Sequence, residues 1–444
     1  MQSHSVYTAT ALIVRPLASL ERIMKSMRRD WEKLDNAAKI YPSTQIKSDT
    51  HVFRFSCELN EDIEPDILQH ALLDTIEIFD LYQVILKRGV FWYYLESSDK
   101  IPMVSEEYST VCGKLYDIDK KTLLLEVTYF HRRINLEMSH ILTDGTGGIN
   151  FIRTLVCKYL SMKLGIDEPA LDYNASRTQM KDDSFNRYYS GSKSLKRSRN
   201  KPSCQLSGPK FADNRLRVIT GHMSSKSILD IAHEHGCTMT VYLSSCLVQA
   251  IADVLPVREK KKPVTLCVPV NLRKYFPSES IRNFFATLYI PYVFSSGDTA
   301  FDGIVSAINE KLKENLTEEN LVRILDGLSA AENNFIAKIV PLRIKDFSLR
   351  RIYKRNLKNY TATLSNVGII TMPDVFRNYI HSFNVTIGTS KMHICVCTYS
   401  DKLSISFSTP FRSSEIERRF FSILTNAGVE VEITANDAEG QEDS

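Results

Sequence analysis

The stretch SHILTDGTGG, residues 139–148, decides how this 444-residue sequence is interpreted. A predicted strand, residues 134–139, runs into it, and an amphipathic segment, residues 150–164, follows it. An imidazole, a carboxylate and three glycines therefore lie in a tight corner between two regular elements. Because regular elements fix side chains better than a free loop does, this corner is the first candidate for acid–base chemistry.

A histidine followed four residues later by an aspartate is not specific by itself. His70 and Asp74 have the same spacing, but they lie on a predicted amphipathic helix, where such a pair is a surface contact. Only His140 and Asp144 are followed by a glycine, Gly145. The alternative for His140 is a hydrogen-bonded histidine at the end of a strand.

Composition indicates a soluble globular protein, with 43% hydrophobic and 24% charged residues. The formal charge of +4 predicts no general affinity for nucleic acid. Residues 187–201 form a basic run without acids, and residues 436–444 are predicted as an acidic, disordered tail. Nine cysteines with scattered spacing predict no disulfide framework, and no run is long enough to span a bilayer. The expected location is the cytoplasm.

Hydrophobic patterns predict mixed sheet and helix in both halves of the chain. From residue 166 to residue 213 the pattern gives way to polar residues, glycine and proline, which predicts a linker between domains. We therefore expect two similar α+β lobes, residues 1–165 and 214–435, that meet at a cleft. The predicted strands are 52–59, 90–96, 123–129, 134–139, 216–223, 264–270, a strand that ends at 289, 362–364, 383–387, 393–398 and 403–408. The predicted helices begin at 65 and 150 in the first half and cover 225–235, 240–255, 303–315, 345–358 and 414–427 in the second.

In this order the motifs resemble those of the chloramphenicol-acetyltransferase-like acyltransferases, especially the alcohol acetyltransferase and condensation-domain branch. The matching motifs are HxxxDG at 140–145, PVNLR at 269–273, NFF at 283–285 and SNVG at 365–368. The similar layout runs from about residue 30 to residue 433. Condensation domains that form peptides usually carry a second histidine where this chain has Ser139, and the plant-type DFGWG signature is missing. Both departures favour an alcohol-acyltransferase-like member.

The resemblance implies a fold of two chloramphenicol-acetyltransferase-like lobes with a central cleft or tunnel. It also implies acyl transfer, expected to be acetyl transfer, from acyl-CoA as cosubstrate to a small alcohol or amine. His140 would be the general base, since the unperturbed imidazole pKa is about 6.5. Asp144 would pair with Arg273 and hold the corner, and Gly145 would let the backbone turn and approach a ligand. Cleft positions are expected at Asn283, Ser365 and Asn366.

No tightly bound cofactor is expected, and no set of histidines and cysteines has the spacing of a metal site. Two other functions remain open. One is a condensation-type enzyme that uses an acyl carrier protein thioester to form an amide or ester. The other is a non-catalytic binding protein on the same fold. The basic segments 187–201 and 343–358 could hold either CoA phosphates or an acidic carrier protein.

Overall fold

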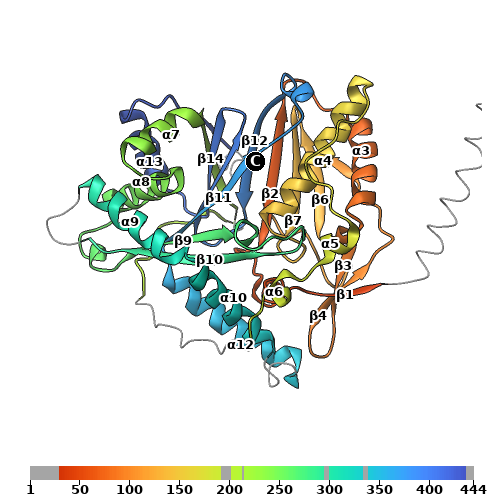
Figure 1. Ribbon diagram of the computed structural model, residues 1–444, viewed down its shortest axis with the longest axis horizontal. Helices are drawn as coiled ribbons and strands as arrows, with labels where there is room; N and C mark the ends of the chain where they lie inside the picture. The colour runs from red at the N-terminus through yellow and green to blue at the C-terminus, as the bar shows by residue number, and fades with distance from the viewer. Residues whose placement is uncertain (1–29, 192–201, 213–214, 295–299, 334–338, 437–444) are drawn as a thin grey trace, which may run out of the picture.

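The computed structural model describes residues 30–191, 202–212, 215–294, 300–333 and 339–436 of the chain. Helices and strands mix in two lobes, each built on a sheet, which confirms the predicted α+β architecture (Figure 1). The strands are β1 (Trp31–Lys33), β2 (Val52–Leu59), β3 (Val84–Arg88), β4 (Tyr93–Ser97), β5 (Val104–Glu106), β6 (Leu125–Phe130), β7 (Arg133–Ser139), β8 (Arg217–Ser224), β9 (Val264–Asn271), β10 (Phe285–Tyr292), β11 (Ala362–Ile370), β12 (Ile380–Ile387), β13 (Met392–Tyr399), β14 (Lys402–Thr409) and β15 (Glu432–Ala435). The α-helices are α2 (Tyr41–Thr44), α3 (Pro65–Ile78), α4 (Gly145–Leu164), α5 (Arg177–Lys181), α6 (Ser184–Arg187), α7 (Ser225–Glu234), α8 (Met239–Val254), α9 (Phe301–Asn315), α10 (Glu318–Asn333), α12 (Leu342–Asn356) and α13 (Glu415–Asn426).

The sheet of the first lobe has the strand order β12-β2-β7-β6-β5. Its strands pair antiparallel except for β5 and β6, and helices α3 and α4 pack together beside it (Figure 1). Phe53 and Phe55 of β2 contact the start of α4, so this sheet carries the corner at residues 139–148. Strand β12 comes from the second half of the chain and pairs with β2 along its length. The second half of the sequence therefore contributes one strand to the sheet of the first lobe.

The sheet of the second lobe has the strand order β10-β9-β11-β13-β14-β8-β15. Helices α7, α8, α9 and α13 gather on one side of it (Figure 1). Alternation along β13 divides its side chains between two cores: Met392 and Ile394 pack under these helices, whereas Cys395 and Cys397 join the core of the first lobe. The far side of this sheet therefore faces the first lobe.

A small sheet, β1-β4-β3, lies at the edge of the first lobe. The prediction of a strand over 90–96 was too long at its start, because the backbone N–H of Gly89 donates to the Trp92 carbonyl and closes a hairpin turn there. Val90 and Phe91 lie exposed at the tip of this hairpin. The backbone N–H of Leu342, at the start of α12, donates to the Val90 carbonyl and joins the tip to that helix.

The segment expected as a linker, 166–213, carries two short helices, α5 and α6, whose Met180 and Phe185 are buried. A capping box between Ser176 and Gln179 starts α5, a signal too local to appear in the hydrophobic pattern. Most of the basic run 187–201 and all of the tail after Asn436 lie outside the described residues. Asn436 itself exchanges hydrogen bonds with Val218 of β8.

Among the described residues, no single helix combines the length and hydropathy of a membrane span. Helices α7 and α8 reach that composition only when taken together, and they are bent by 83° relative to each other.

Candidate active site

His140 follows the last residue of β7 and lies between the two lobes. Its backbone N–H donates to the His51 carbonyl at 2.9 Å, and its ring Nδ1 lies 3.2 Å from the Thr143 carbonyl oxygen. A carbonyl oxygen can only accept a hydrogen bond, so Nδ1 carries the proton and Nε2 keeps a free lone pair. The local backbone therefore selects the tautomer in which Nε2 is the basic atom.

Aromatic rings surround the His140 imidazole. Tyr41 stacks on it with a centroid distance of 5.3 Å, Phe53 meets it edge-on at 4.7 Å, and Phe285 lies at 6.2 Å. Burial among these groups, together with the nearby His51, lowers the pKa of His140 to about 4. The imidazole is consequently neutral at pH 7, as a general base must be.

Asp144 is the N-cap of α4, and both carboxylate oxygens are engaged away from the His140 ring. Oδ1 accepts hydrogen bonds from the backbone N–H groups of Thr146 and Gly147, at 3.0 and 3.4 Å. Oδ2 accepts from Arg273 Nη1 at 2.6 Å and from the Phe284 N–H at 2.8 Å. Asp144 therefore holds the helix start and the second lobe together.

Each guanidinium nitrogen of Arg273 donates a hydrogen bond. Arg273 lies on a short 3-10 helix, η4 (Leu272–Lys274), directly after β9. Its Nε and Nη2 donate to the Ser280 carbonyl, and Nη2 also donates to the Arg282 carbonyl at 2.6 Å. A buried ion pair persists only when its remaining donors and acceptors are satisfied, and this one meets that condition.

The glycines of the corner belong to the first turns of α4, which begins at Gly145 and not near residue 150 as expected. The predicted helix began too late because glycine weakens a helical pattern, whereas the Asp144 cap fixes the actual start of α4. A Cβ at Gly147 would lie 2.6 Å from the Ile281 carbonyl oxygen, and one at Gly148 would lie 2.8 Å from the Phe53 ring. Close packing, more than a turn, therefore requires glycine at 147 and 148.

A cavity of about 460 Å³ opens beside the His140 ring. Asp144 and Gly145 also line it, together with Ser365 and Asn366 of β11, as expected from the sequence. Its other walls come from β9, β10, α8 and α9. Apolar side chains there are Val241, Val268, Val270, Phe285, Leu312 and Leu316, and two cations, Lys274 and Lys313, line it as well.

Asn283 is not at the cavity wall, although the sequence placed it in the cleft. Its side chain is buried, with 2% exposed, because its Nδ2 donates to the His140 carbonyl at 3.0 Å and to Asp35 Oδ2 at 2.9 Å. Burial raises the pKa of Asp35 to about 6. Asn283 therefore supports the backbone of His140 from beneath.

The motif SNVG, residues 365–368, forms a bulge inside β11. The register with β13 shifts between Asn366 and Gly368, and Gly368 adopts a φ of +89°, which favours glycine. The Gly368 N–H donates to Asn366 Oδ1 at 2.9 Å, and Asn366 Nδ2 donates to Thr240 at 3.1 Å. The bulge thus fixes the side chain of Asn366 where β11 meets the cavity.

Several residues of the site were not singled out from the sequence. Tyr41, which stacks on His140, comes from a four-residue helix without a hydrophobic pattern. His51 precedes β2 with a φ of +50°, which a sequence does not reveal. Asn271 lies within the PVNLR motif and donates to the Thr146 hydroxyl at 3.0 Å, so that motif was the available signal.

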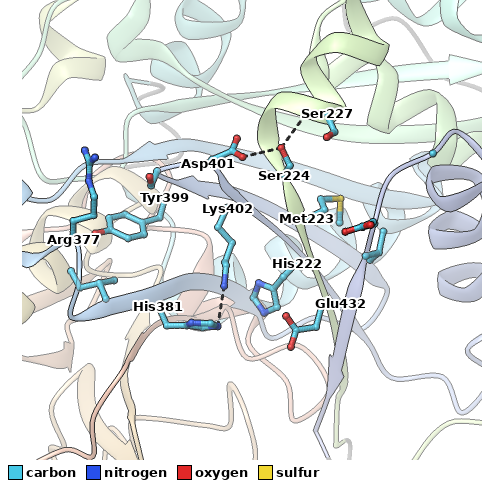
Figure 2. A pocket seen from close by; sticks show the side chains of 15 residues that line it. His222, Met223, Ser224, Ser227, Arg377, His381, Tyr399, Asp401, Lys402 and Glu432 are labelled. Carbon is cyan, nitrogen blue, oxygen red and sulfur yellow. Dashed lines mark hydrogen bonds between the residues drawn. The ribbon is translucent and has the colours of Figure 1, made fainter.

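A larger pocket, of about 910 Å³, lies elsewhere, between β12 and the ends of β8, β14 and β15. Figure 2 shows Lys402 pointing at His381, with a distance of 2.9 Å between Nζ and Nε2, and His222 next to Glu432. Most of its charged side chains are exposed, and the HxxxDG residues are not among its lining. The smaller cavity at His140 is therefore the candidate active site. No cluster of three or more possible metal ligands occurs in the described part of the chain.

No protein-family model matches this sequence, and no curated protein matches it. Solved structures do match. TRI101 of F. graminearum, complexed with coenzyme A and T-2 mycotoxin, is 10% identical with a TM-score of 0.61, over 90% of this chain and 99% of that one. TRI3 trichothecene 15-O-acetyltransferase of Fusarium sporotrichioides is 11% identical with a TM-score of 0.58, over 90% and 96%. A double mutant of the starter condensation domain of rhizomide synthetase RzmA, in complex with C8-CoA and Leu-SNAC, is 11% identical with a TM-score of 0.57, over 92% and 96%.

These matches cover both lobes of the present chain. The fold is therefore the two-lobed fold of the chloramphenicol-acetyltransferase-like acyltransferases and condensation domains, as the sequence motifs implied. At such low identity the matches establish the fold alone.

Proposed function

We propose that this protein transfers an acyl group, with acetyl as the first candidate, from a CoA thioester to the hydroxyl group of an alcohol. His140 is the general base in this proposal. The observation that carries it is the state of the imidazole: neutral, with Nδ1–H directed at the Thr143 carbonyl and Nε2 free, on a ring that lines a cavity between two lobes.

The reaction follows from that state. Nε2 takes the proton of the acceptor hydroxyl while the oxygen attacks the thioester carbonyl carbon, which gives a tetrahedral oxyanion. The intermediate collapses with loss of the CoA thiolate, and the proton on Nε2 passes to that sulfur. His140 is then neutral again, and no covalent enzyme intermediate is needed.

The developing oxyanion needs hydrogen-bond donors. The helix-start amides of Thr146 and Gly147 are engaged by Asp144, and that of Gly148 by the Asp144 carbonyl, so these amides do not serve. The hydroxyl of Thr146 accepts from Asn271, which leaves its own proton available, and Ser365 is a second hydroxyl in the cavity wall. We assign the oxyanion to these hydroxyls.

The cavity supports a CoA thioester as donor. Its apolar walls suit an acyl chain, and Lys274 and Lys313 supply positive charge for phosphate groups. Coenzyme A and C8-CoA are bound in two of the matching structures. All nine cysteines of the chain are buried thiols, which is compatible with the reducing cytoplasm as the location.

A second candidate is transfer from a carrier-protein thioester, because condensation domains are among the matching structures. The test is release of free thiol from acetyl-CoA and longer acyl-CoAs with a panel of alcohols and amines. Release that depends on an acceptor alcohol supports the proposal. Turnover of a carrier thioester with no turnover of acyl-CoA would select the second candidate, and tight ligand binding without thiol release would indicate a non-catalytic binding protein.

A further inference from the structure

Helix α12 presents large apolar side chains to solvent. Ile344, Phe347 and Ile352 are 57%, 61% and 49% exposed. Ile344 and Phe347 are three residues apart and lie on one face of the helix, with Ile352 beside them. Large apolar side chains gathered on one exposed surface indicate an interaction site more often than isolated ones do.

The same face is strongly cationic. Exposed Arg343, Arg351, Lys354 and Arg355 flank the apolar residues. Among the residues that the structure describes, no carboxylate forms an ion pair with any of these four. The one acid of the helix, Asp346, turns inward, where it accepts hydrogen bonds from Ser43 and Tyr93. The outer face therefore combines apolar groups with uncompensated positive charge.

The tip of the β3–β4 hairpin extends this surface. Val90 and Phe91, 73% and 44% exposed, lie next to the start of α12, because Leu342 N–H and Lys345 Nζ donate to their carbonyls. Figure 1 shows α12 and the β4 hairpin at the same end of the molecule. We call this surface, made of Val90, Phe91 and the outer face of α12, the basic apolar patch.

The inner face of α12 is held mainly by polar contacts. Arg350 Nε donates to the Ser43 carbonyl at 2.7 Å, and the Tyr353 hydroxyl donates to Asp49 at 2.6 Å. Tyr353 also packs edge-on against His51. These contacts fix α12 against α2 and leave Ile344, Phe347 and Ile352 on the outer side.

We propose that the basic apolar patch binds the surface of a bilayer that contains anionic lipids. A helix with lysine and arginine flanking aromatic and aliphatic side chains lies in the plane of a membrane interface, with its apolar groups inserted and its cations at the phosphates. Val90 and Phe91, at the tip of the β3–β4 hairpin, add apolar groups next to the start of α12. An acidic protein would pair with the cations but has no need of five exposed apolar side chains, so lipid is the better match.

Sedimentation with vesicles tests the proposal on the full chain. Wild type is expected to sediment with vesicles of phosphatidylcholine and phosphatidylserine, and much less with phosphatidylcholine alone or at high salt. Arg351→Gln with Arg355→Gln removes two cations and is expected to weaken binding roughly thirty-fold. Ile344→Ser with Phe347→Ser is expected to abolish binding without a change in thermal melting, because both side chains are exposed in the folded chain.

The control variants lie in other segments of the chain. Arg418→Gln with Arg419→Gln removes two cations of α13, and Val257→Ser with Val375→Ser removes two exposed apolar groups. Neither control is expected to change sedimentation. The proposal would be overturned if wild type bound neither vesicle type or bound both equally. It would also be overturned if the control variants lost as much binding as the patch variants. Binding of an acidic carrier protein through the patch, with no vesicle binding, would overturn it in favour of a protein partner.

Discussion

Arg273 donates to Asp144 across 2.6 Å, and this pair joins the N-terminus of α4 in one lobe to the end of β9 in the other. Both side chains are buried, and neither forms a hydrogen bond with the His140 ring. Asp144 is thus a structural neighbour of the imidazole, and the His140 tautomer is set by the Thr143 carbonyl instead.

Removal of either member of this pair should cost stability. Asp144→Ala and Arg273→Ala each leave a buried charge without its partner, which costs about 3–5 kcal/mol of the free energy of unfolding. Urea denaturation measures this loss. Arg323→Ala, which breaks the exposed pair with Glu319 on α10, is the control and should cost less than about 1 kcal/mol. If Asp144→Ala and Arg273→Ala lose no more free energy of unfolding than Arg323→Ala, the pair does not hold the lobes together.

Two glycines of the corner, Gly145 and Gly147, should respond differently to alanine. Alanine in a helix interior is normally about 1 kcal/mol more favourable than glycine. At Gly145 the added Cβ meets only Val367 at 3.6 Å, so that variant should keep its stability. At Gly147 it would approach the Ile281 carbonyl at 2.6 Å, and backbone there must move, so a loss of about 1–3 kcal/mol is expected. Equal stability of Gly145→Ala and Gly147→Ala would contradict the observed packing.

The low pKa of His140 should appear in the pH dependence of kcat/KM. With the pKa at about 4, the imidazole stays deprotonated through the range in which an ordinary histidine, with a pKa of about 6.5, takes up a proton. The rate should therefore stay level as the pH falls from 7 to about 5. An acid limb with an apparent pKa near 6.5 would show that the catalytic base is not buried as described.

Stability should fall in the same pH range. The buried His140 and His393 have pKa values lowered to about 4 and about 3, so the unfolded chain binds protons below about pH 6.5 that the folded chain does not. Their contribution is complete above pH 6.5 and is lost as the pH falls toward these folded-state values. The urea concentration at the midpoint of unfolding should therefore decline from pH 7 to pH 5. The kcat/KM profile must be measured at pH values where the chain is still folded. Midpoints that rise toward pH 5 would contradict the buried, neutral state of the two rings.

Much of the architecture followed from the sequence because both sheets are built from strands with strong apolar patterns, such as β2 and β14. His140 and Asp144 were singled out from the residues of the corner, Arg273 came from the resemblance, and the structure brings all three together. Short elements escaped prediction: β1 and β5 have three residues each, and α2 has four. Hydrogen bonds from distant segments stabilise such pieces, and periodicity does not record those contacts.

The placement of individual side chains was harder still. Asn283 was expected in the cleft, but its position beneath His140 depends on Asp35, 248 residues away in sequence. The stacking of Tyr41 on His140 likewise depends on how α12 holds α2 in place. Such contacts arise from the packing of the two lobes, which one sequence does not specify to the level of single atoms.

The central claim is that His140 removes the proton of the acceptor. The most direct measurement is acceptor-dependent release of CoA thiol by wild type, His140→Ala and, as a control, His381→Ala, an exposed histidine of the pocket in Figure 2. We predict that His140→Ala lowers kcat by roughly 10²–10⁴ with its thermal melting retained, while His381→Ala keeps the wild-type rate. A folded His140→Ala variant with wild-type turnover would contradict the account.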